Sequence, residues 1–383
     1  MKPCALIYVQ HLLGTGHLVR SAALARGLAH AGWDVQVASG GRPAPHISFG
    51  ASVLHQLPPI HAADTSFKLL HDARRRPVDD ALRHARTGML LDLFVGARPD
   101  AVVVETYPFG RRQMEFELLP LLKTAKRSKH KPVVACSVRD ILQMAKNRAR
   151  LEASASIVAA YFDRVLVHGD PRFVAFDETF PLAPRIADKI VYTGYVANDN
   201  AKHDPATARG DDVIVSAGGG PVGLQLLQTA LAARPLSAGK RGVWRLLAAS
   251  DLAPKLPALR RKAPPNVSIE KVRADFPALL RAARVSVSQA GYNTVMDILQ
   301  AGVAAVLVPF AAGHETEQTM RAIRLASHGR AIMIGEHELT PAKLAAAIDR
   351  AAALPVPRLE LNLDGVANSV AALRAAIDAR KAT

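Results

Sequence analysis

The sequence predicts an α/β protein with two doubly wound domains, each built on a parallel β-sheet. Three observations support this prediction. Short β-branched runs alternate with Ala-, Leu- and Arg-rich stretches, the runs are apolar throughout, and one polar segment interrupts the pattern. Continuously apolar strands separated by helices are typical of parallel sheets buried on both faces. The length of 383 residues accommodates two domains of about 150–200 residues.

In the first half of the chain, residues 5–9 are predicted as a strand and residues 17–31 as a helix closed by Gly32. A second strand is expected at 35–39. Further strands separated by helices are predicted at 101–104, 132–136, 164–167 and 189–193. Together these elements form the predicted N-terminal domain, residues 1–196.

Residues 197–211 are polar, contain Pro and Gly, and show no periodicity, so they are the predicted linker. A second domain is expected over 212–383. Its predicted strands are 212–216, 243–249, 267–270, 285–288 and 304–308, and its predicted helices are 222–233, 276–283, 294–301 and 315–326. The last predicted helix, 366–380, is expected to pack back on the first domain. Two sheets joined by one linker predict a ligand-binding cleft between the domains.

The formal net charge is +16 and the pI is about 10.2. This balance favours nucleic acid, anionic lipid headgroups or phosphorylated small molecules as partners. An Arg-rich composition typical of a GC-rich gene predicts the same charge without such a partner. Basic runs at 74–76 and 123–131 are either a solvated face or a contact with an anionic membrane, with 118–122 as its apolar companion. Because aromatic residues do not interleave with these runs, nucleic acid is not expected.

Two cysteines, Cys4 and Cys136, are too few for a disulfide framework and indicate a reducing compartment. The apolar run at 4–9 is too short for a signal peptide. The longest apolar stretch, 301–313, contains Gly302 and Pro309 and is not expected to cross a bilayer. The expected location is therefore cytoplasmic, with a peripheral position on the inner face of the membrane as an alternative.

Four strand-to-helix loops carry the candidate chemistry. The first contains Gly14, Thr15 and Gly16, followed by His17. Its glycines permit a tight turn, and the helix start behind them favours a negative charge. It is not the dinucleotide fingerprint, because Val19 occupies the third glycine position. His17 is a candidate general base, and the alternative is a His that only caps or packs.

The second loop has three consecutive glycines, Gly218, Gly219 and Gly220, directly after a predicted strand. Bare amides at such a turn suit a diphosphate, and the alternative is a tight turn without a ligand. No Lys-Ser or Lys-Thr follows, so the loop is not a Walker motif.

The third and fourth loops add polar groups in the same domain. Gly291 with the amides of Asn293 and Thr294 is a second candidate phosphate site, and Asp297 lies one helical turn further, where it can accept from ribose hydroxyls. The fourth loop is expected to hold sugar hydroxyls, or merely to cap a helix. The other candidates from these two loops are Gln289, His314, Glu317 and Gln318. His314-Glu315 is not a zinc motif, because position 318 is Gln.

At these four loops the chain resembles the GT-B glycosyltransferases of family 28, whose best-known member adds N-acetylglucosamine to the lipid-linked peptidoglycan precursor. The stretches ETYPFGRR at 105–112 and VRD at 138–140 are similar to a bacterial branch of predicted glycosyltransferases. The resemblance implies two Rossmann-like domains facing a cleft. It also implies that Gly218–Gly220 hold the donor diphosphate and that Gly14, Gly16 and His17 form an acceptor-side loop.

Further site residues follow from this resemblance. Gly291, Asn293 and Thr294 would lie under the phosphates, and Arg273 near the base. Asp297 would hold the ribose, where the family usually has the longer Glu. Glu317 and Gln318 stand where the family often has two glutamines, which predicts an altered sugar preference.

The expected reaction is an inverting transfer from a UDP-sugar to a hydroxyl acceptor, which is lipid-linked or a cell-envelope glycan. His17 or Glu105 would be the base, with burial at a strand end raising the pKa of Glu105. No Asp-x-Asp occurs in the sequence, so no metal or other cofactor is expected. Two alternatives stay open: a nucleotide-sugar hydrolase or epimerase on the same fold, and a non-catalytic polyanion-binding protein.

Overall fold

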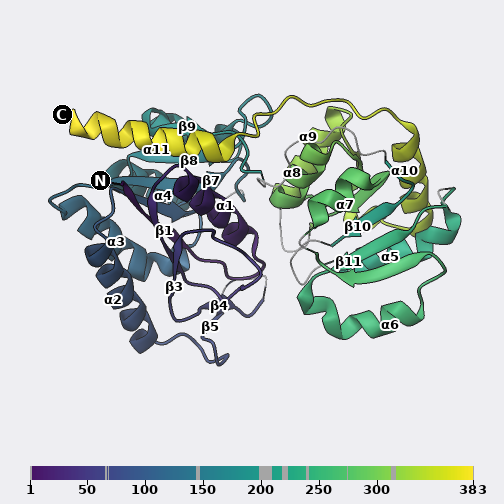
Figure 1. Ribbon diagram of the computed structural model, residues 1–383, viewed down its shortest axis with the longest axis horizontal. Helices are drawn as coiled ribbons and strands as arrows, with labels where there is room; N and C mark the ends of the chain where they lie inside the picture. Colours follow the sequence, from purple (N-terminus) through teal and green to yellow (C-terminus); the bar gives the residue numbers. More distant parts are fainter. Residues whose placement is uncertain are drawn as a thin grey trace. The chain divides into compact units, whose positions relative to one another are not determined.

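The structure is a computed structural model, and the chain divides into two units (Figure 1). Unit 1 comprises Met1–Val196 and Leu361–Thr383, and unit 2 comprises Ala197–Glu360. The residues that the structure describes are 2–64, 67, 69–143, 147–197, 209–217, 223–238, 241–273, 275–311 and 316–382, without the side chains of residues 250 and 251. The chain therefore passes between the units twice, near residues 196 and 361.

Unit 1 contains a seven-stranded sheet in the order β3-β2-β1-β6-β7-β8-β9. All of its neighbouring strands are parallel. The strands are β1 Cys4–Val9, β2 Asp34–Ser39, β3 Val53–Gln56, β6 Ala101–Glu105, β7 Val133–Arg139, β8 Arg164–His168 and β9 Ile190–Tyr192. The order reverses between β1 and β6, where connections leave the sheet in opposite directions. Ligands bind outside the carboxyl ends of the strands at such a reversal.

Alternate residues of the unit 1 strands point to opposite faces of this sheet. Ala5, Ile7 and Val9 of β1 share one core with α1 (Gly16–His30) and α11 (Gly365–Lys381). Leu6 and Tyr8 face a second core, formed with α2 (Asp80–Ala97), α3 (Glu115–Arg127) and α4 (Arg148–Tyr161). A small antiparallel hairpin, β4 (His61–Ala62) and β5 (Leu70–His71), lies beside it. The last helix of the chain is thus part of the N-terminal core (Figure 1).

The contact between α1 and α11 depends on a glycine. A Cβ on Gly27 would lie 2.1 Å from Val366 Cγ1. We expect Gly27→Ala to destabilise unit 1 by about 1–3 kcal/mol, because the added methyl group overpacks this contact. Gly88→Ala is the matched control, since Gly88 lies within α2 with open space around it. The control is expected to gain up to about 1 kcal/mol from helix propensity. Equal unfolding free energies for the two variants would contradict the expected role of Gly27.

Unit 2 contains a six-stranded sheet in the order β12-β11-β10-β13-β14-β15, also parallel throughout. The strands are β10 Val213–Ser216, β11 Trp244–Ala248, β12 Val267–Lys271, β13 Val285–Ser288, β14 Ala304–Leu307 and β15 Ile332–Met333. Its order reverses between β10 and β13. The two units therefore share one topological principle, a parallel sheet whose strand order reverses beside its first strand.

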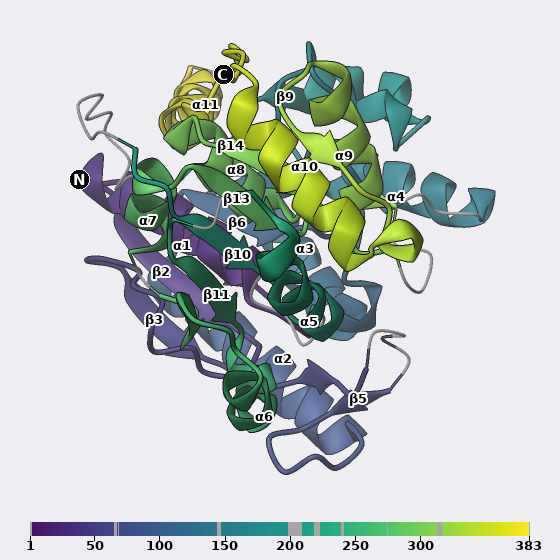
Figure 2. The same ribbon diagram turned by 90° about the vertical axis from the view of Figure 1, so that its right-hand side faces the viewer.

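Helices α5 (Leu224–Ala233), α6 (Leu256–Arg261) and α10 (Pro341–Ala353) share the main core of unit 2 with the strands. Figure 2 shows α5 and α10 beside this sheet, and the two helices are in contact. The remaining α-helices of the described part are α7 (Phe276–Ala282), α8 (Tyr292–Ala301) and α9 (Glu317–Ser327). Helix α8 follows β13, so its first turn lies at the carboxyl edge of the sheet.

The predicted α/β class with two parallel sheets is confirmed. The predicted strands agree with the observed ones to within three residues, whereas β3, β15 and the β4–β5 hairpin were not predicted. Most of the predicted linker, residues 198–208, lies outside the described residues. In the described part of the chain, no helix combines the length and the apolar character needed to cross a membrane.

Candidate active site

The first candidate site lies at the strand reversal of unit 1. His17 occupies the first turn of α1, directly after β1, and Glu105 is the last residue of the neighbouring strand β6. Their side chains meet, with His17 Nδ1 2.9 Å from Glu105 Oε1. The structure therefore brings together the two residues that the sequence offered as alternative bases.

Glu105 is an ionised hydrogen-bond acceptor. Its side chain is 1% exposed and forms an ion pair with Arg20. Thr106 Oγ1 donates to Glu105 Oε1 over 2.9 Å, and Ser137 Oγ donates to Glu105 Oε2 over 2.6 Å. Burial favours the neutral acid, but the charge of Arg20 and the hydrogen bonds from His17 and Ser137 outweigh it and hold the pKa of Glu105 well below its ordinary range. The expectation of a net rise in the pKa of Glu105 is therefore wrong, although burial by itself acts in that direction.

His17 is an uncharged imidazole at neutral pH. Its side chain is 14% exposed, and burial together with the charges of Arg111 and Arg139 keeps its pKa well below 6.5, although Glu105 acts in the opposite direction. Since ionised Glu105 can only accept, Nδ1 carries the proton of the neutral ring. Nε2 then holds a free lone pair, which is the form a general base requires. Gly14, with a positive φ of 31°, Thr15 and Gly16 form the turn that precedes it.

A second candidate site lies at the strand reversal of unit 2. Ser216 and Ser288 are register partners at the ends of β10 and β13, so the loops after these strands start side by side. Gly291 is the N-cap of α8 and has no side chain to accept from the first amides of the helix, and a Cβ at Gly291 would meet open space. The first turn of α8, which includes the amides of Asn293 and Thr294, therefore starts next to the open space at Gly291. The start of a helix at such a place suits an anion.

Apart from Glu317 and Gln318, the other predicted donor-site residues fall into three groups. Asp297 and Gln289 belong to the β13–α8 segment and are 6% and 8% exposed. Arg273 follows β12, which is separated from β10 by β11, and it forms ion pairs with Glu270 and Asp275. Four predicted residues lie outside the described residues: Gly218, Gly219, Gly220 and His314.

A buried arginine that was not predicted from the sequence connects the elements around this second site. The side chain of Arg321 is fully buried, and its Nη1 donates to Ala290 O over 3.0 Å. Its Nη2 pairs with Glu317 Oε1 at 3.0 Å, and its guanidinium lies 5.6 Å from the ring centroid of Tyr292. Gln318 Oε1 accepts from Phe310 N at 3.2 Å. Gln318 thus contacts the loop after β14 directly, whereas Glu317 is connected to the loop before α8 through Arg321. The i,i+4 spacing of Glu317 and Arg321 was the available sequence signal.

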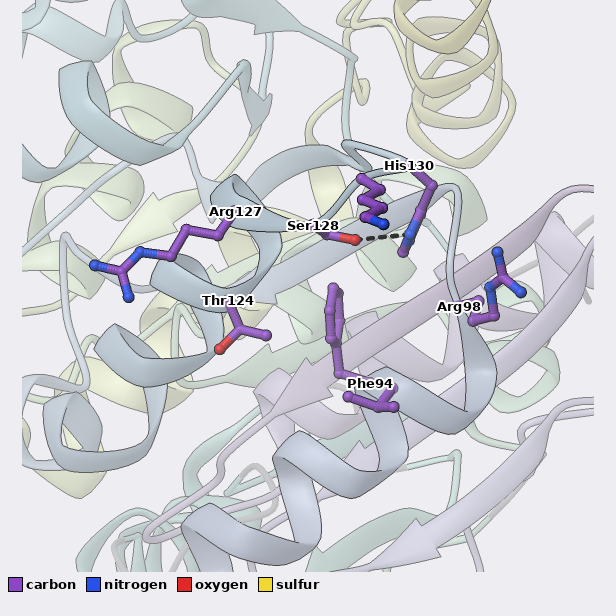
Figure 3. A pocket seen from close by; sticks show the side chains of 8 residues that line it. Phe94, Arg98, Thr124, Arg127, Ser128 and His130 are labelled. Atoms are coloured by element: carbon purple, nitrogen blue, oxygen red, sulfur yellow. Dashed lines mark hydrogen bonds between the residues drawn. The ribbon is translucent and has the colours of Figure 1, made fainter.

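A surface pocket of about 620 Å³ lies at the amino ends of strands in the unit 1 sheet, whereas the His17–Glu105 pair lies at the carboxyl ends (Figure 3). It is formed where α2 and α3 end, immediately before β6 and β7 begin. Its lining includes Arg98, Arg127, Lys129, His130 and the exposed Val95. Residues 118–122 were predicted to be an apolar membrane contact beside the basic run at 123–131. This prediction is wrong, because α3 buries Leu118, Leu121 and Leu122 in the core.

Comparison with known proteins finds a family match for part of the chain and similar folds for the whole of it. Residues 220–357 match the glycosyltransferase family 28 C-terminal domain. The curated UDP-N-acetylglucosamine–N-acetylmuramyl-(pentapeptide) pyrophosphoryl-undecaprenol N-acetylglucosamine transferase of Xanthomonas axonopodis pv. citri (strain 306) is 31% identical over 144 residues, which are 37% of this chain and 34% of the relative. The same-named protein of Thermotoga maritima (strain ATCC 43589 / DSM 3109 / JCM 10099 / NBRC 100826 / MSB8) is 26% identical over 178 residues, 46% of this chain and 50% of the relative. The chain thus spans a third to a half of these relatives.

The solved structures extend the likeness to the whole fold. The calicheamicin glycosyltransferase CalG4 superposes with a TM-score of 0.63 at 17% identity, covering 100% of this chain and 98% of that one. Acinetobacter baumannii MurG superposes with a TM-score of 0.59 at 17% identity, covering 97% and 100%. The predicted GT-B fold with two Rossmann-like domains is confirmed.

Proposed function

Because residues 220–357 form a glycosyltransferase family 28 C-terminal domain in a chain with the GT-B fold, we propose that the protein transfers a sugar from a UDP-sugar to a hydroxyl acceptor. The observation that carries the proposal is the His17–Glu105 pair at the strand reversal of unit 1. A neutral imidazole held by a buried carboxylate is suited to take a proton from an attacking hydroxyl. In this scheme unit 1 supplies the base and unit 2 holds the nucleotide sugar.

The proposed reaction is a single displacement. The acceptor oxygen attacks the anomeric carbon while His17 Nε2 takes its proton. The bond from the anomeric carbon to the diphosphate oxygen breaks, and UDP leaves with that electron pair. Because the new bond forms on the face opposite the leaving group, the anomeric configuration inverts. Glu105 keeps the proton on Nδ1 and stabilises the imidazolium that forms.

Charge on the departing diphosphate would be balanced by backbone amides. We assign this role to the first turn of α8 and, from the sequence, to Gly218–Gly220. Asp297 would accept from the ribose hydroxyls. Glu317 and Gln318 would orient the loops through Arg321 and Phe310. The proposal assigns no metal, in keeping with a sequence that lacks Asp-x-Asp.

The proposal is tested by calorimetry with UDP and by assays of UDP-sugars with and without hydroxyl acceptors. We expect UDP to bind, and Asp297→Ala to weaken its binding by about tenfold or more, because a charge-assisted hydrogen bond is lost. Glu360→Ala, an exposed carboxylate of the same unit, is the control. NMR of the product anomer tests inversion. Stoichiometric sugar release without an acceptor would instead support the nucleotide-sugar hydrolase.

The acidic limb of the pH profile tests the state of His17. The charge of Arg111 lowers the pKa of His17, and activity requires the neutral ring, so the parent is expected to stay active as the pH falls through 6.5. Arg111→Gln removes this charge, raises the pKa of His17 and moves the acidic limb of kcat/KM to higher pH. Arg111→Lys retains the charge and serves as the control. Superimposable profiles for the two variants would contradict this electrostatic role.

We also propose that the acceptor is lipid-linked or a cell-envelope glycan and that the enzyme works on the inner face of the membrane. Arg98, Arg127 and Lys129 surround the pocket of Figure 3, and each basic residue near an anionic surface contributes about 1 kcal/mol. Vesicles containing anionic phospholipid should sediment the protein at low salt, and Arg127→Glu/Lys129→Glu should weaken this binding. Equal binding of the variant, or a preference for nucleic acid over the vesicles, would argue against it.

A further inference from the structure

A chain of buried hydrogen bonds leads from Glu105 across the carboxyl ends of three further strands. Ser137 of β7 has its Oγ 2.6 Å from Glu105 Oε2 and 2.9 Å from Nε2 of His168, the last residue of β8. His168 Nδ1 lies 2.9 Å from Thr193 Oγ1, directly after β9. Ser137, His168 and Thr193 are each at most 1% exposed. Water therefore does not compete for these contacts.

The charge of Glu105 determines which group donates in each of these hydrogen bonds. An ionised carboxylate can only accept, so Ser137 donates its one hydroxyl proton to Glu105. The Ser137 oxygen then accepts from His168, which must carry its proton on Nε2. Burial and the charge of Arg20 lower the pKa of His168 to about 3, so the ring is neutral and its Nδ1 accepts from Thr193.

The chain has one competing arrangement. Thr193 Oγ1 is also 3.0 Å from Gly194 O and 3.3 Å from Val167 O. If Thr193 donated to one of these carbonyls, His168 would carry its proton on Nδ1 and Ser137 would donate to His168 instead. Glu105 Oε2 would lose a donor. A buried carboxylate without that donor is disfavoured, so the first arrangement is the stable one.

We propose that Ser137 and His168 are positioning residues that hold the Glu105 carboxylate against His17 and thereby set the basicity of His17. The inference rests on the proposed function, in which His17 is the base. Other groups also face the pair: Arg20 from α1, Thr106 and Arg111 after β6, and Arg139 of β7. None of these residues is replaced in the variants below, so the comparison between variants isolates the hydrogen bonds of Ser137 and His168.

The expected consequence of Ser137→Ala follows from the charge of Glu105. Without the Ser137 donor, the negative charge is concentrated on the oxygen that faces His17. The carboxylate becomes a stronger acceptor for Nδ1–H, and the imidazolium form of His17 is stabilised. The pKa of His17 should rise by about 0.5 unit. The looser carboxylate should also lower kcat by about tenfold with little change in KM, since substrate binding is not involved.

The experiment measures the modification of His17 by diethyl pyrocarbonate against pH, with mass spectrometry identifying the peptide. Only the neutral imidazole reacts, so the profile reports the pKa of His17 in the full-length protein without any substrate. His168→Phe should behave like Ser137→Ala to a smaller extent. His168→Gln should stay close to the parent, because its amide can replace the Nε2–H donor. Ser369→Ala is the matched control, a buried serine hydroxyl in α11 that bonds only to Gly365 O among the described contacts.

The outcomes separate this inference from the proposed function. A raised His17 pKa in Ser137→Ala and His168→Phe, absent in Ser369→Ala and His168→Gln, supports it. An unchanged titration in Ser137→Ala overturns it, as does an equal shift in Ser369→Ala, which would indicate general loosening of the core. If no transferase activity is found, the proposed function fails while the titration still tests the hydrogen-bond chain.

Discussion

Replacement of His17 with alanine is expected to lower kcat/KM for sugar transfer by about two to four orders of magnitude. The imidazole supplies the lone pair that takes the acceptor proton, and a methyl group supplies none. The neighbouring Glu105 is a poor substitute, because the charge of Arg20 and the hydrogen bonds to Glu105 hold its pKa so low that the carboxylate is a weak proton acceptor. UDP affinity should be unchanged, since the assigned nucleotide groups all belong to unit 2. Calorimetry with UDP and initial-rate kinetics check the two halves of this prediction.

His30→Ala is the matched control for this variant. His30 is the last residue of the same helix, is exposed, and contacts no part of the His17–Glu105 pair among the described interactions. The control should retain parental kinetics. Loss of UDP binding in His17→Ala would show that our division of roles between the units is wrong. Retention of more than about a tenth of the parental kcat/KM would remove His17 as the base.

The sequence predicted the two residues of the unit 1 pair, His17 and Glu105, better than the side chains that hold them in place. His17 and Glu105 follow two apolar strands, and the meeting of strand ends at one edge of a parallel sheet is a general rule. The role of Arg20 could have been predicted in the same way, because Arg20 lies three residues after His17 on the same face of the helix. The roles of Ser137 and His168 could not have been predicted. They depend on which strands become neighbours, and the strand order is a tertiary property.

The fold could likewise be predicted where the signal is local, and could not be predicted where it depends on tertiary contacts. Continuous apolar strands and glycine-terminated helices have local sequence signals, so the strands of both sheets other than β3 and β15 were predicted to within three residues. Edge strand β3, with Val53 and Leu54 about half exposed, carries no buried run that would reveal it. The return of α11 to unit 1 was expected, but its close contact with Gly27 is a tertiary feature that no periodicity encodes.

Unit 1 also depends on an ion pair that no local pattern revealed. Arg86 of α2 and Glu117 of α3 are both fully buried. Arg86 Nε and Nη2 lie 2.9 and 2.6 Å from the two oxygens of Glu117, and Tyr8 donates to the same carboxylate. Arg86 also donates to the side chain of Gln10 at 3.0 Å and to Gly40 O at 3.0 Å. One guanidinium thus connects both helices to β1 and to the loop after β2.

Arg86→Ala is expected to destabilise unit 1 by about 3–5 kcal/mol, the largest stability effect that we predict. The reason is the carboxylate of Glu117, which would stay buried without its cation. Arg83→Ala is the matched control, because Arg83 lies on the same helix and its pair with Asp80 is exposed. It should cost less than about 1 kcal/mol. Denaturant unfolding of all variants in a Trp244→Phe background follows unit 1 through Trp33, the other of the two tryptophans.

A double-mutant cycle separates the ion pair from simple loss of packing. In Arg86→Met/Glu117→Leu neither charge is left alone, so the double variant should be destabilised by less than the sum of the two single variants. It should still fall below the parent, because Tyr8, Gln10 and the carbonyl of Gly40 lose their partner. Strict additivity would mean that the two side chains act independently, and the buried charge would then not be the reason why unit 1 needs Arg86. Gln10 connects this result to the site, since its backbone oxygen accepts from Arg111 at 2.7 Å. A double variant that folds but has a shifted His17 titration would show that the core pair also places the charge that keeps His17 neutral.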